Sequence, residues 1–405
     1  MNLRHLEGLV AIIRTGSFSA AAAEISLSQS ALTQAVARME ADAAAALFER
    51  GSHGAAPTAA GATLGERASR ALALINDAGR NHLPAARAQL LSRRATMTQL
   101  KALSAVERAG SFRGGARAAR LSEPSVHRSI RDLERSFGQG LFVRIGTSLQ
   151  PTPAARDLAR ATRLAIAEIE AGLEQIAGGR DRRLVIGAMP LVRAGLLPAA
   201  VAQLCAQEPN VRLQVVEGPY PELLNALLDG ELDMLLGALR DPAPRGTIQR
   251  RLFDDDLVIV ARTDHPLARS SGWTAEALLD FPWAASPEGT PRRQRWEGMM
   301  AAAGIEAPLP RVECSSASPI RGLLLQGDWL AMLSPDQFRI ERELGLLAPL
   351  GGPLPASTRI IGLTTRAGWE PDAIQQTLLD ILDRCASAHD VSVGHADPAE
   401  RRFSV

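Results

Sequence analysis

The chain has 405 residues, which is long enough for two or three hydrophobic cores. Its 46% hydrophobic and 22% charged residues fit a folded soluble protein, and a net charge of +1 gives no overall sign of nucleic-acid binding. No secretory signal and no apolar run of about 18 residues stands out, which predicts a cytoplasmic protein without a membrane span. Three scattered cysteines, Cys205, Cys314 and Cys385, fit neither a disulfide framework nor a zinc site.

A segment near the start of the chain is repeated. Residues 3–60 return without gaps 94 positions later as residues 97–154, with 17 of 58 aligned positions identical. The shared landmarks are Gly16-Ser17-Phe18 with Gly110-Ser111-Phe112, Leu27-Ser28 with Leu121-Ser122, Glu40 with Glu134, Leu47-Phe48 with Leu141-Phe142, Arg50 with Arg144, and Pro57-Thr58 with Pro151-Thr152. A unit of this length that occurs only twice indicates domain duplication rather than a solenoid array.

Three short helices are predicted in the first copy. Apolar residues at three- and four-residue spacing predict a helix over 3–15 that ends at Gly16, and an alanine-rich helix follows over 18–25. Ser28 is placed to cap a third helix over 29–40, because its oxygen accepts from the unpaired amides of the first turn. The buried residues of this third helix are Leu32, Val36 and Met39, and its outward residues include Gln29, Thr33 and Gln34. An exposed face of short polar side chains suits the major groove of DNA.

The second copy has the same buried pattern and a different surface. Residues 1–60 hold four basic and five acidic side chains, a net charge of −1, whereas residues 97–156 hold ten basic and four acidic ones, a net charge of +6. Because phosphate contacts supply most non-specific affinity, the second copy is predicted to be the stronger DNA binder. Ser122 is its predicted helix cap, and Arg128 is suited to the acceptors of guanine.

Each copy resembles the DNA-binding domain of LysR-type transcriptional regulators, over residues 1–65 and 95–155. That family has a Gly-Ser-Phe turn, an alanine-rich helix, a recognition helix opened by Ser-Gln-Pro, then Leu-Phe-x-Arg and a Leu-Thr wing. The first copy has Ser30 where the family has proline, and the second has Glu123 where it has glutamine. The resemblance implies that double-stranded DNA is approached by Gln29, Thr33, Gln34 and Arg50 in the first copy and by Ser122, Ser125, His127, Arg128, Arg131 and Arg144 in the second. We hypothesise that the first copy is weakened or serves another role, such as packing.

Each copy continues into a helical stripe of apolar residues. The first stripe is Leu64, Ala68, Ala71 and Ile75, and the second is Ile166, Ile169, Leu173 and Ile176. Either stripe can pair with a partner chain or pack on its own chain. The resemblance to LysR-type proteins implies a dimerisation linker at 156–180 after the winged helix-turn-helix at 95–155, with a helical connector at 61–94 after the first winged helix-turn-helix at 1–60.

The carboxy-terminal half alternates strands with helices. Strands are predicted near 184–188, 211–216, 234–237 and 257–260, with helices over 196–207 and 221–228, and this alternation indicates a parallel sheet. Further strands near 283–285, 311–313 and 330–333 suggest a second small sheet, and 360–363 returns to the first. The resemblance implies a two-lobed α/β effector domain at 183–388, similar to periplasmic binding proteins. Lobe one would span 183–262 and 348–388, lobe two 263–347, and a flexible tail 389–405. The whole chain is thus a multi-domain α and α/β protein.

A ligand cleft is expected between the lobes, beyond the carboxyl ends of the strands. Thr290-Pro291 and Ser318-Pro319 each resemble a helix N-cap followed by proline, which would aim free amides at a small anion. The resemblance implies an effector site that includes Met189, Pro190, Arg193, Tyr220, Ser286, Thr290, Ser315, Ser316 and Ser318. For Tyr220 an ordinary packed aromatic is the alternative, and for Arg193 a solvated charge.

Enzyme motifs are missing from the sequence. No Gly-x-Ser-x-Gly elbow, phosphate loop or metal-ligand pair stands out, so no catalysis, cofactor or metal is predicted. The expected function is a transcriptional regulator of the LysR type, an activator or repressor controlled by an anionic small molecule. Its expected partners are DNA, the effector, further copies as a homodimer or homotetramer, and RNA polymerase as a candidate. The alternative is a ligand-binding or scaffold protein whose helix-turn-helix modules mediate association.

Overall fold

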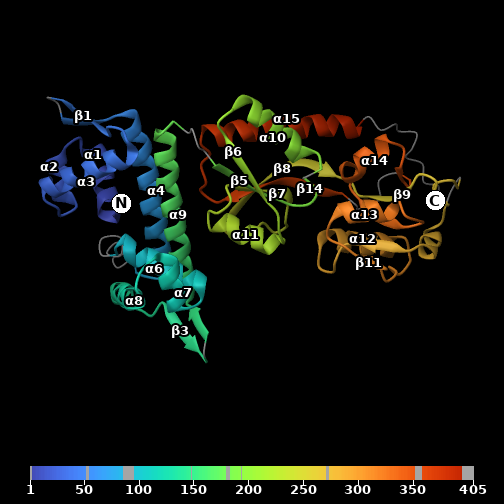
Figure 1. The fold of residues 1–405 in the computed structure, drawn as a ribbon, viewed down its shortest axis with the longest axis horizontal. Coiled ribbons are helices and arrows are strands. Elements are labelled where there is room, and N and C mark those ends of the chain that lie inside the picture. The colour runs from blue at the N-terminus through green and yellow to red at the C-terminus, as the bar shows by residue number, and fades with distance from the viewer. Residues whose placement is uncertain are drawn as a thin grey trace. The chain divides into compact units, whose positions relative to one another are not determined.

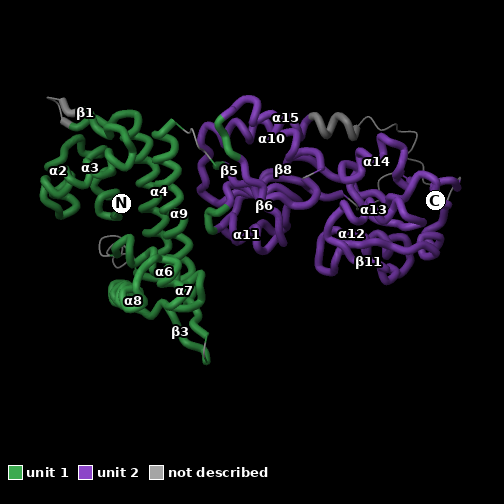
Figure 2. Tube along the Cα trace, viewed as in Figure 1, with its two compact units in different colours: residues 1–183, 210–212, 229–231 green, residues 184–209, 213–228, 232–405 purple. Residues whose placement is uncertain are grey.

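The computed structural model describes residues 2–51, 54–84, 95–146, 148–178, 183–192, 194–270, 273–351 and 358–394. The chain forms two compact units (Figure 2). Unit 1 contains residues 1–183 with the short segments 210–212 and 229–231, and unit 2 contains the rest. Among the described helices, none is long and apolar enough to cross a membrane.

Unit 1 consists of two winged helix-turn-helix modules, each followed by a long helix. Module one comprises α1 (Leu3–Thr15), α2 (Phe18–Glu24), α3 (Gln29–Ala43), β1 (Phe48–Gly51), β2 (Gly54–Pro57) and α4 (Ala59–Arg80). Module two comprises α6 (Met97–Ala109), α7 (Phe112–Ala119), α8 (Glu123–Phe137), β3 (Phe142–Ile145), β4 (Ser148–Pro151) and α9 (Pro153–Ile176). The three helices predicted in the first copy are confirmed, and Leu32, Val36 and Met39 are buried on α3.

The repeated landmarks hold the same turns in both modules. Gly16 and Gly110 end the first helix of each module in the left-handed region, with φ of 66° and 62°, which glycine adopts without strain. Ser28 and Ser122 cap the recognition helices α3 and α8, accepting from backbone amides at 3.2 and 3.3 Å. Both predicted caps are therefore confirmed.

The repeated glutamate and threonine fasten the wing to the rest of each module. Oε1 of Glu40 accepts from the amide of Leu47 at 2.9 Å, and Oε1 of Glu134 accepts from Leu141 at 2.8 Å. After the wing, the Thr58 and Thr152 side chains cap α4 and α9. These contacts satisfy backbone donors where the regular structure ends, so this glutamate and this threonine are framework residues in both copies.

The two long helices pack against each other within the chain. Figure 1 shows α4 and α9 side by side, and two side-chain contacts show that the helices run in opposite directions. Arg67 Nη1 lies 3.0 Å from Glu168 Oε2, and His82 Nε2 lies 2.7 Å from Asp157 Oδ2. The stripe Leu64, Ala68, Ala71 and Ile75 is fully buried. This stripe therefore packs on its own chain, which decides between the two alternatives left open by its sequence.

Unit 2 contains two five-stranded sheets. The first has the order β6-β5-β7-β14-β8 and the second β11-β10-β12-β9-β13. The first lobe comprises β5 (Arg183–Ala188), α10 (Leu196–Gln207), β6 (Arg212–Val216), α11 (Tyr220–Leu228), β7 (Met234–Ala238), β8 (Thr247–Asp255), β14 (Arg359–Arg366) and α15 (Ala373–Gly394). The second comprises β9 (Val258–Arg262), a 3-10 helix Ala275–Asp280, β10 (Trp283–Ala285), α12 (Pro291–Ala302), β11 (Val312–Glu313), α13 (Ala317–Leu324), β12 (Leu330–Leu333), a 3-10 helix Pro335–Phe338, α14 (Arg339–Glu343) and β13 (Leu347–Pro349).

The sheets differ from the prediction in two respects. β9 pairs with β12 and β13, so the chain enters the second sheet before Val258, and the predicted lobe boundary at 262 is wrong. The first sheet is mixed rather than parallel: β5 and β7 run parallel, but β14 is antiparallel to both β7 and β8. The long strand β8 was not predicted, because its buried and exposed residues do not alternate regularly.

The tight contact between Gly61 and the wing of module one predicts a large effect of a single methyl group. A Cβ atom at Gly61 would lie 1.9 Å from the carbonyl oxygen of Leu47, a backbone atom that also accepts from the Thr58 amide. We expect Gly61→Ala to lower the free energy of unfolding by about 2 kcal/mol, measured by urea denaturation. Gly298→Ala on α12, where a Cβ meets nothing within 4 Å, should instead be neutral or stabilising. Equal effects of both changes would contradict this packing.

Candidate DNA-reading and ligand-binding sites

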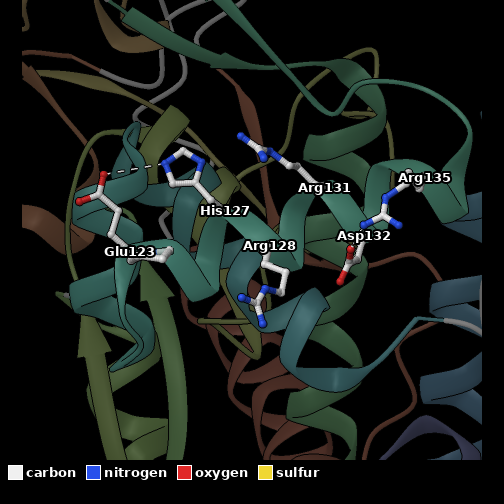
Figure 3. A pocket seen from close by; sticks show the side chains of 7 residues that line it. Glu123, His127, Arg128, Arg131, Asp132 and Arg135 are labelled. Carbon is white, nitrogen blue, oxygen red and sulfur yellow. Dashed lines mark hydrogen bonds and ion pairs between the residues drawn. The ribbon is translucent and has the colours of Figure 1, made fainter.

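The recognition helix of module two carries a strongly polar outer face. A hollow of about 640 Å³ runs along α8, lined by Glu123, Pro124, His127, Arg128, Arg131, Asp132 and Arg135. Figure 3 shows the basic side chains projecting from this helix, with Glu123 beside His127. Arg128 and Arg131 are exposed, as is Arg144 on the wing strand β3. These three guanidinium groups are placed to meet an anionic surface such as the DNA backbone.

Other predicted residues of module two have structural partners. The Ser122 hydroxyl accepts from the Ser125 amide and lies 2.7 Å from the Ser125 hydroxyl, so both serines serve the helix cap. The His127 ring stacks on Phe112 with centroids 3.9 Å apart, and its Nε2 lies 3.8 Å from Glu123 Oε1. His127 is therefore held in place by its neighbours before any ligand arrives.

The recognition helix of module one has an uncharged outer face at its start. Gln29 and Gln34 are exposed, and the Thr33 hydroxyl donates to the carbonyl of Gln29 at 2.9 Å. Because Gln29 and Gln34 are exposed, this face of α3 is not buried against the rest of the described chain. Arg50 belongs to β1, and its side chain lies outside the described part of the structure.

In unit 2, Arg240 lies over Tyr220, and arginines from both lobes lie near Arg359. The Arg240 guanidinium lies 4.1 Å from the centre of the Tyr220 ring. Burial and the positive charge of Arg359 lower the pKa of Arg292 to about 10, and the same two causes lower the pKa of Arg295. Burial also lowers the pKa of Arg240, and the positive charge of Arg359 lowers it further. We call Arg240, Arg292, Arg295 and Arg359 the arginine cluster.

Several donors around the arginine cluster are unsatisfied. Arg359 Nε donates to Asp255 Oδ2 at 2.7 Å, but its Nη2 is buried without a hydrogen-bond partner among the described residues. The hydroxyl of Tyr220 is also buried without a hydrogen-bond partner among the described residues. Burial raises the pKa of Tyr220. Arg292 donates to the hydroxyl of Ser286, a neutral group. Mutual repulsion and unused donors are both relieved by a bound anion.

The remaining residues that were predicted to bind the effector lie at several sites outside the arginine cluster. Pro190, Ser316 and Ser318 line a neighbouring cavity of about 340 Å³ together with Arg321 and Arg339. Thr290 caps α12 as predicted, with its hydroxyl accepting from the Arg293 amide at 3.3 Å. The cap predicted at Ser318 is wrong, because α13 begins at Ala317 and Ser316 is its N-cap residue. Met189 and Tyr220 both pack against the apolar cluster around Leu227. Ser315 is exposed, and Arg193 lies outside the described residues.

The arginine cluster was mostly missed by sequence reasoning. Its members lie on the β7–β8 connection, on α12 and on β14, separated by up to about 120 residues. No local spacing connects them. The available signal was Arg292 itself, which directly follows the Thr290-Pro291 helix start. Among the described residues, no group of His, Cys, Asp or Glu is arranged to hold a metal ion.

Two winged helix-turn-helix modules joined to a two-lobed domain with a polar cleft define a DNA-binding regulator with a ligand-binding domain. Residues 3–62 and 97–156 match the bacterial regulatory helix-turn-helix family of the LysR type, and residues 177–386 match the LysR substrate binding domain. The chain belongs to the LysR family of transcriptional regulators, whose members bind DNA and small-molecule effectors and form oligomers.

Relatives of known sequence support this membership, and two solved structures share the fold. The chain is 34% identical to the HTH-type transcriptional regulator GalR of Pseudomonas putida over 374 residues, 91% of this chain and 93% of the relative. It is 30% identical to the Escherichia coli regulator YdcI over 281 residues, 68% of this chain and 91% of the relative. The fold is similar to ArgP from Mycobacterium tuberculosis (TM-score 0.57, 19% identity, 71% and 96% covered) and to a full-length OxyR variant from Pseudomonas aeruginosa (TM-score 0.53, 20% identity, 72% and 94% covered).

Two adjacent arginines on α12 should respond in opposite ways to substitution. Arg293 is buried, with ion pairs to Glu297 and Glu313, so Arg293→Met leaves two carboxylates without their partner. We expect Arg293→Met to cost about 2 kcal/mol of stability. Arg292→Met removes a repelled charge and should leave the thermal unfolding midpoint unchanged or raised. A large loss of stability in Arg292→Met would contradict the repulsion.

Proposed function

We propose that module two supplies most of the DNA affinity of this regulator and that the arginine cluster binds an anionic effector. The first part is supported by the exposed Arg128, Arg131 and Arg144 on α8 and the wing, against the uncharged start of α3. The observation that carries the second part is the lowered pKa of Arg292 beside Arg359, in a site whose Tyr220 and Arg359 donors have no partner in the described structure.

Control by the effector requires two arrangements of the protein. A ligand shifts their balance only if it binds one arrangement more tightly than the other. The two lobes of unit 2 are connected at Asp255 on β8, whose carboxylate binds Arg359 and accepts from Ser334 behind β12. An anion that engages Arg359 therefore acts on a residue that already joins the lobes.

Further parts of the proposal follow from membership of the family. We propose a cytoplasmic location, where the DNA target lies, a homo-oligomeric assembly, and contact with RNA polymerase during regulation. We also propose that the chain catalyses no reaction, since its relatives are named as regulators. In the loop Cys314-Ser315-Ser316, Ser316 then has a role in the cavity wall rather than in nucleophilic chemistry.

DNA binding can be tested through its salt dependence. The probe is the duplex upstream of the gene for this protein, and affinity is measured by fluorescence anisotropy at several salt concentrations. We expect Arg128→Ala to weaken binding by about tenfold and to reduce the salt slope by about one, because a guanidinium charge that displaces a counterion from the DNA is lost. Gln29→Ala should weaken binding less and leave the slope unchanged. The reverse pattern contradicts the assignment to module two, and salt-independent binding would support a scaffold protein instead.

The effector class can be tested by thermal shift. Wild-type protein should be stabilised by small carboxylates or inorganic phosphate more than by neutral compounds of similar size, because binding to the native state raises its stability. Arg292→Met should abolish the difference, and Tyr220→Phe should reduce it. Arg339→Met, in the neighbouring cavity, is the matched control and should retain it. An unchanged profile in Arg292→Met and Tyr220→Phe would exclude the arginine cluster as the effector site.

A further inference from the structure

The pairing of α4 with α9 relates the two modules by an approximate two-fold axis. Gly172 on α9 faces Leu64 and Arg67 on α4, Glu168 faces Arg67 and Arg70, and Asp157 faces His82, so the helices are antiparallel. Counting inward from these contacts brings Ala71 opposite Ala165. These two alanines occupy the same position of the 94-residue repeat. An antiparallel crossing at equivalent residues is the signature of two-fold symmetry.

Burial follows the same symmetry on both helices. Leu64 and Leu158, Ala68 and Thr162, Ala71 and Ala165, and Ile75 and Ile169 are equivalent pairs, and all eight residues are buried. Both modules share one continuous hydrophobic core that includes these residues. Each long helix also keeps contact with the first helix of its own module, through α1 with α4 and α6 with α9. The two recognition helices α3 and α8 are thus carried as the two halves of one symmetric frame.

The charges at this interface favour the pairing of α4 with α9 over the pairing of either helix with a second copy of itself. Glu168 binds Arg67 at 3.0 Å and Arg70 at 3.0 Å, and the Arg67 and Glu168 side chains are only 9% and 19% exposed. The residues equivalent to Glu168 and Arg67 in the other copy are Leu74 and Ala161. Pairing α4 with a second α4 would place Arg67 against Leu74, and pairing α9 with a second α9 would place Glu168 against Ala161. Both alternatives leave a charge largely buried without its counter-ion, which is costly.

We propose that a single chain forms its own paired DNA-reading unit and that this unit recognises duplex DNA with two unlike half-sites. Paired recognition helices read two half-sites, and their symmetry is mirrored in the operator. Here the frame is symmetric but the readers are not: α3 presents Gln29 and Gln34, and α8 presents Arg128 and Arg131. Glutamine pairs with adenine and arginine with guanine, so the two half-sites differ in sequence. This inference rests on the DNA binding proposed above and adds the number of chains and the asymmetry of the target.

The intrachain pairing can be tested by a disulfide. A Cβ atom at Gly172 would lie 3.3 Å from that of Arg67, close to the separation found in disulfides. Arg67→Cys with Gly172→Cys is prepared in full-length protein from which Cys205, Cys314 and Cys385 have been replaced by serine. After oxidation we expect a cross-linked monomer on a non-reducing gel, in a yield independent of protein concentration. Gly172→Cys alone is the control. A covalent dimer as the main product, or no cross-link in a variant whose circular dichroism shows a folded protein, would overturn the proposal.

The unlike half-sites can be tested independently of those cysteines. Hydroxyl-radical footprinting on the same upstream duplex locates the half-sites, and each half-site is then scrambled in turn. In wild-type protein, both scrambled duplexes should bind roughly tenfold more weakly. The double variant Gln29→Ala, Gln34→Ala should become insensitive to scrambling of one half-site only, and Arg128→Ala to the other. Glu66→Gln, exposed on α4, should behave as wild type.

These outcomes separate the inference from the proposed function. No salt-sensitive binding to any duplex would contradict DNA binding itself. Binding that depends on Arg128 but ignores Gln29 and Gln34 at both half-sites would leave the regulator intact and would overturn the paired reader.

Discussion

The antiparallel packing of α4 against α9 is the constraint on which unit 1 depends. It buries the stripe centred on Ala71 and Ala165, and small residues at the crossing let the two helices approach closely. The modules are small, and each contributes residues to a core that continues through these helices into the other module. The two modules are therefore not independent domains, and a change in the α4–α9 pair alters the placement of both recognition helices.

Duplication followed by divergence explains which residues the two copies share. The retained residues hold the frame: Gly16 and Gly110 in the left-handed turns, and Glu40 and Glu134 on the wing amides. Many of the changed residues lie on the outer faces, such as Gln34 and Arg128, where substitution costs little stability. The difference between Leu74 and Glu168, both partly buried, is tolerated because Arg67 and Arg70 face Glu168 from the other helix. The difference between the copies therefore favours their pairing with each other.

Local features could be predicted from the sequence, and long-range pairings could not. Helix caps at Ser28, Ser122 and Thr290 depend on the next three residues, and all three were predicted correctly. The apolar stripe from Leu64 to Ile75 showed which face is buried but not what covers it, because the covering helix lies about 100 residues away. The same limit misplaced Val258–Arg262, a strand whose sheet is chosen by its partners β12 and β13. The arginine cluster was missed for this reason too.

In the proposed effector site, the charge of the arginine cluster and the contact between the lobes share one carboxylate. Arg359 lowers the pKa of three neighbouring arginines and donates to the carboxylate of Asp255, which is 2% exposed. Asp255 also accepts from Ser334 in the other lobe, so the charge balance of the cluster and the contact between the lobes share one residue. An anion that neutralises the cluster would compete with Asp255 for the Arg359 guanidinium and would weaken that ion pair. By reciprocity, whatever fixes the lobes also changes the affinity for the anion.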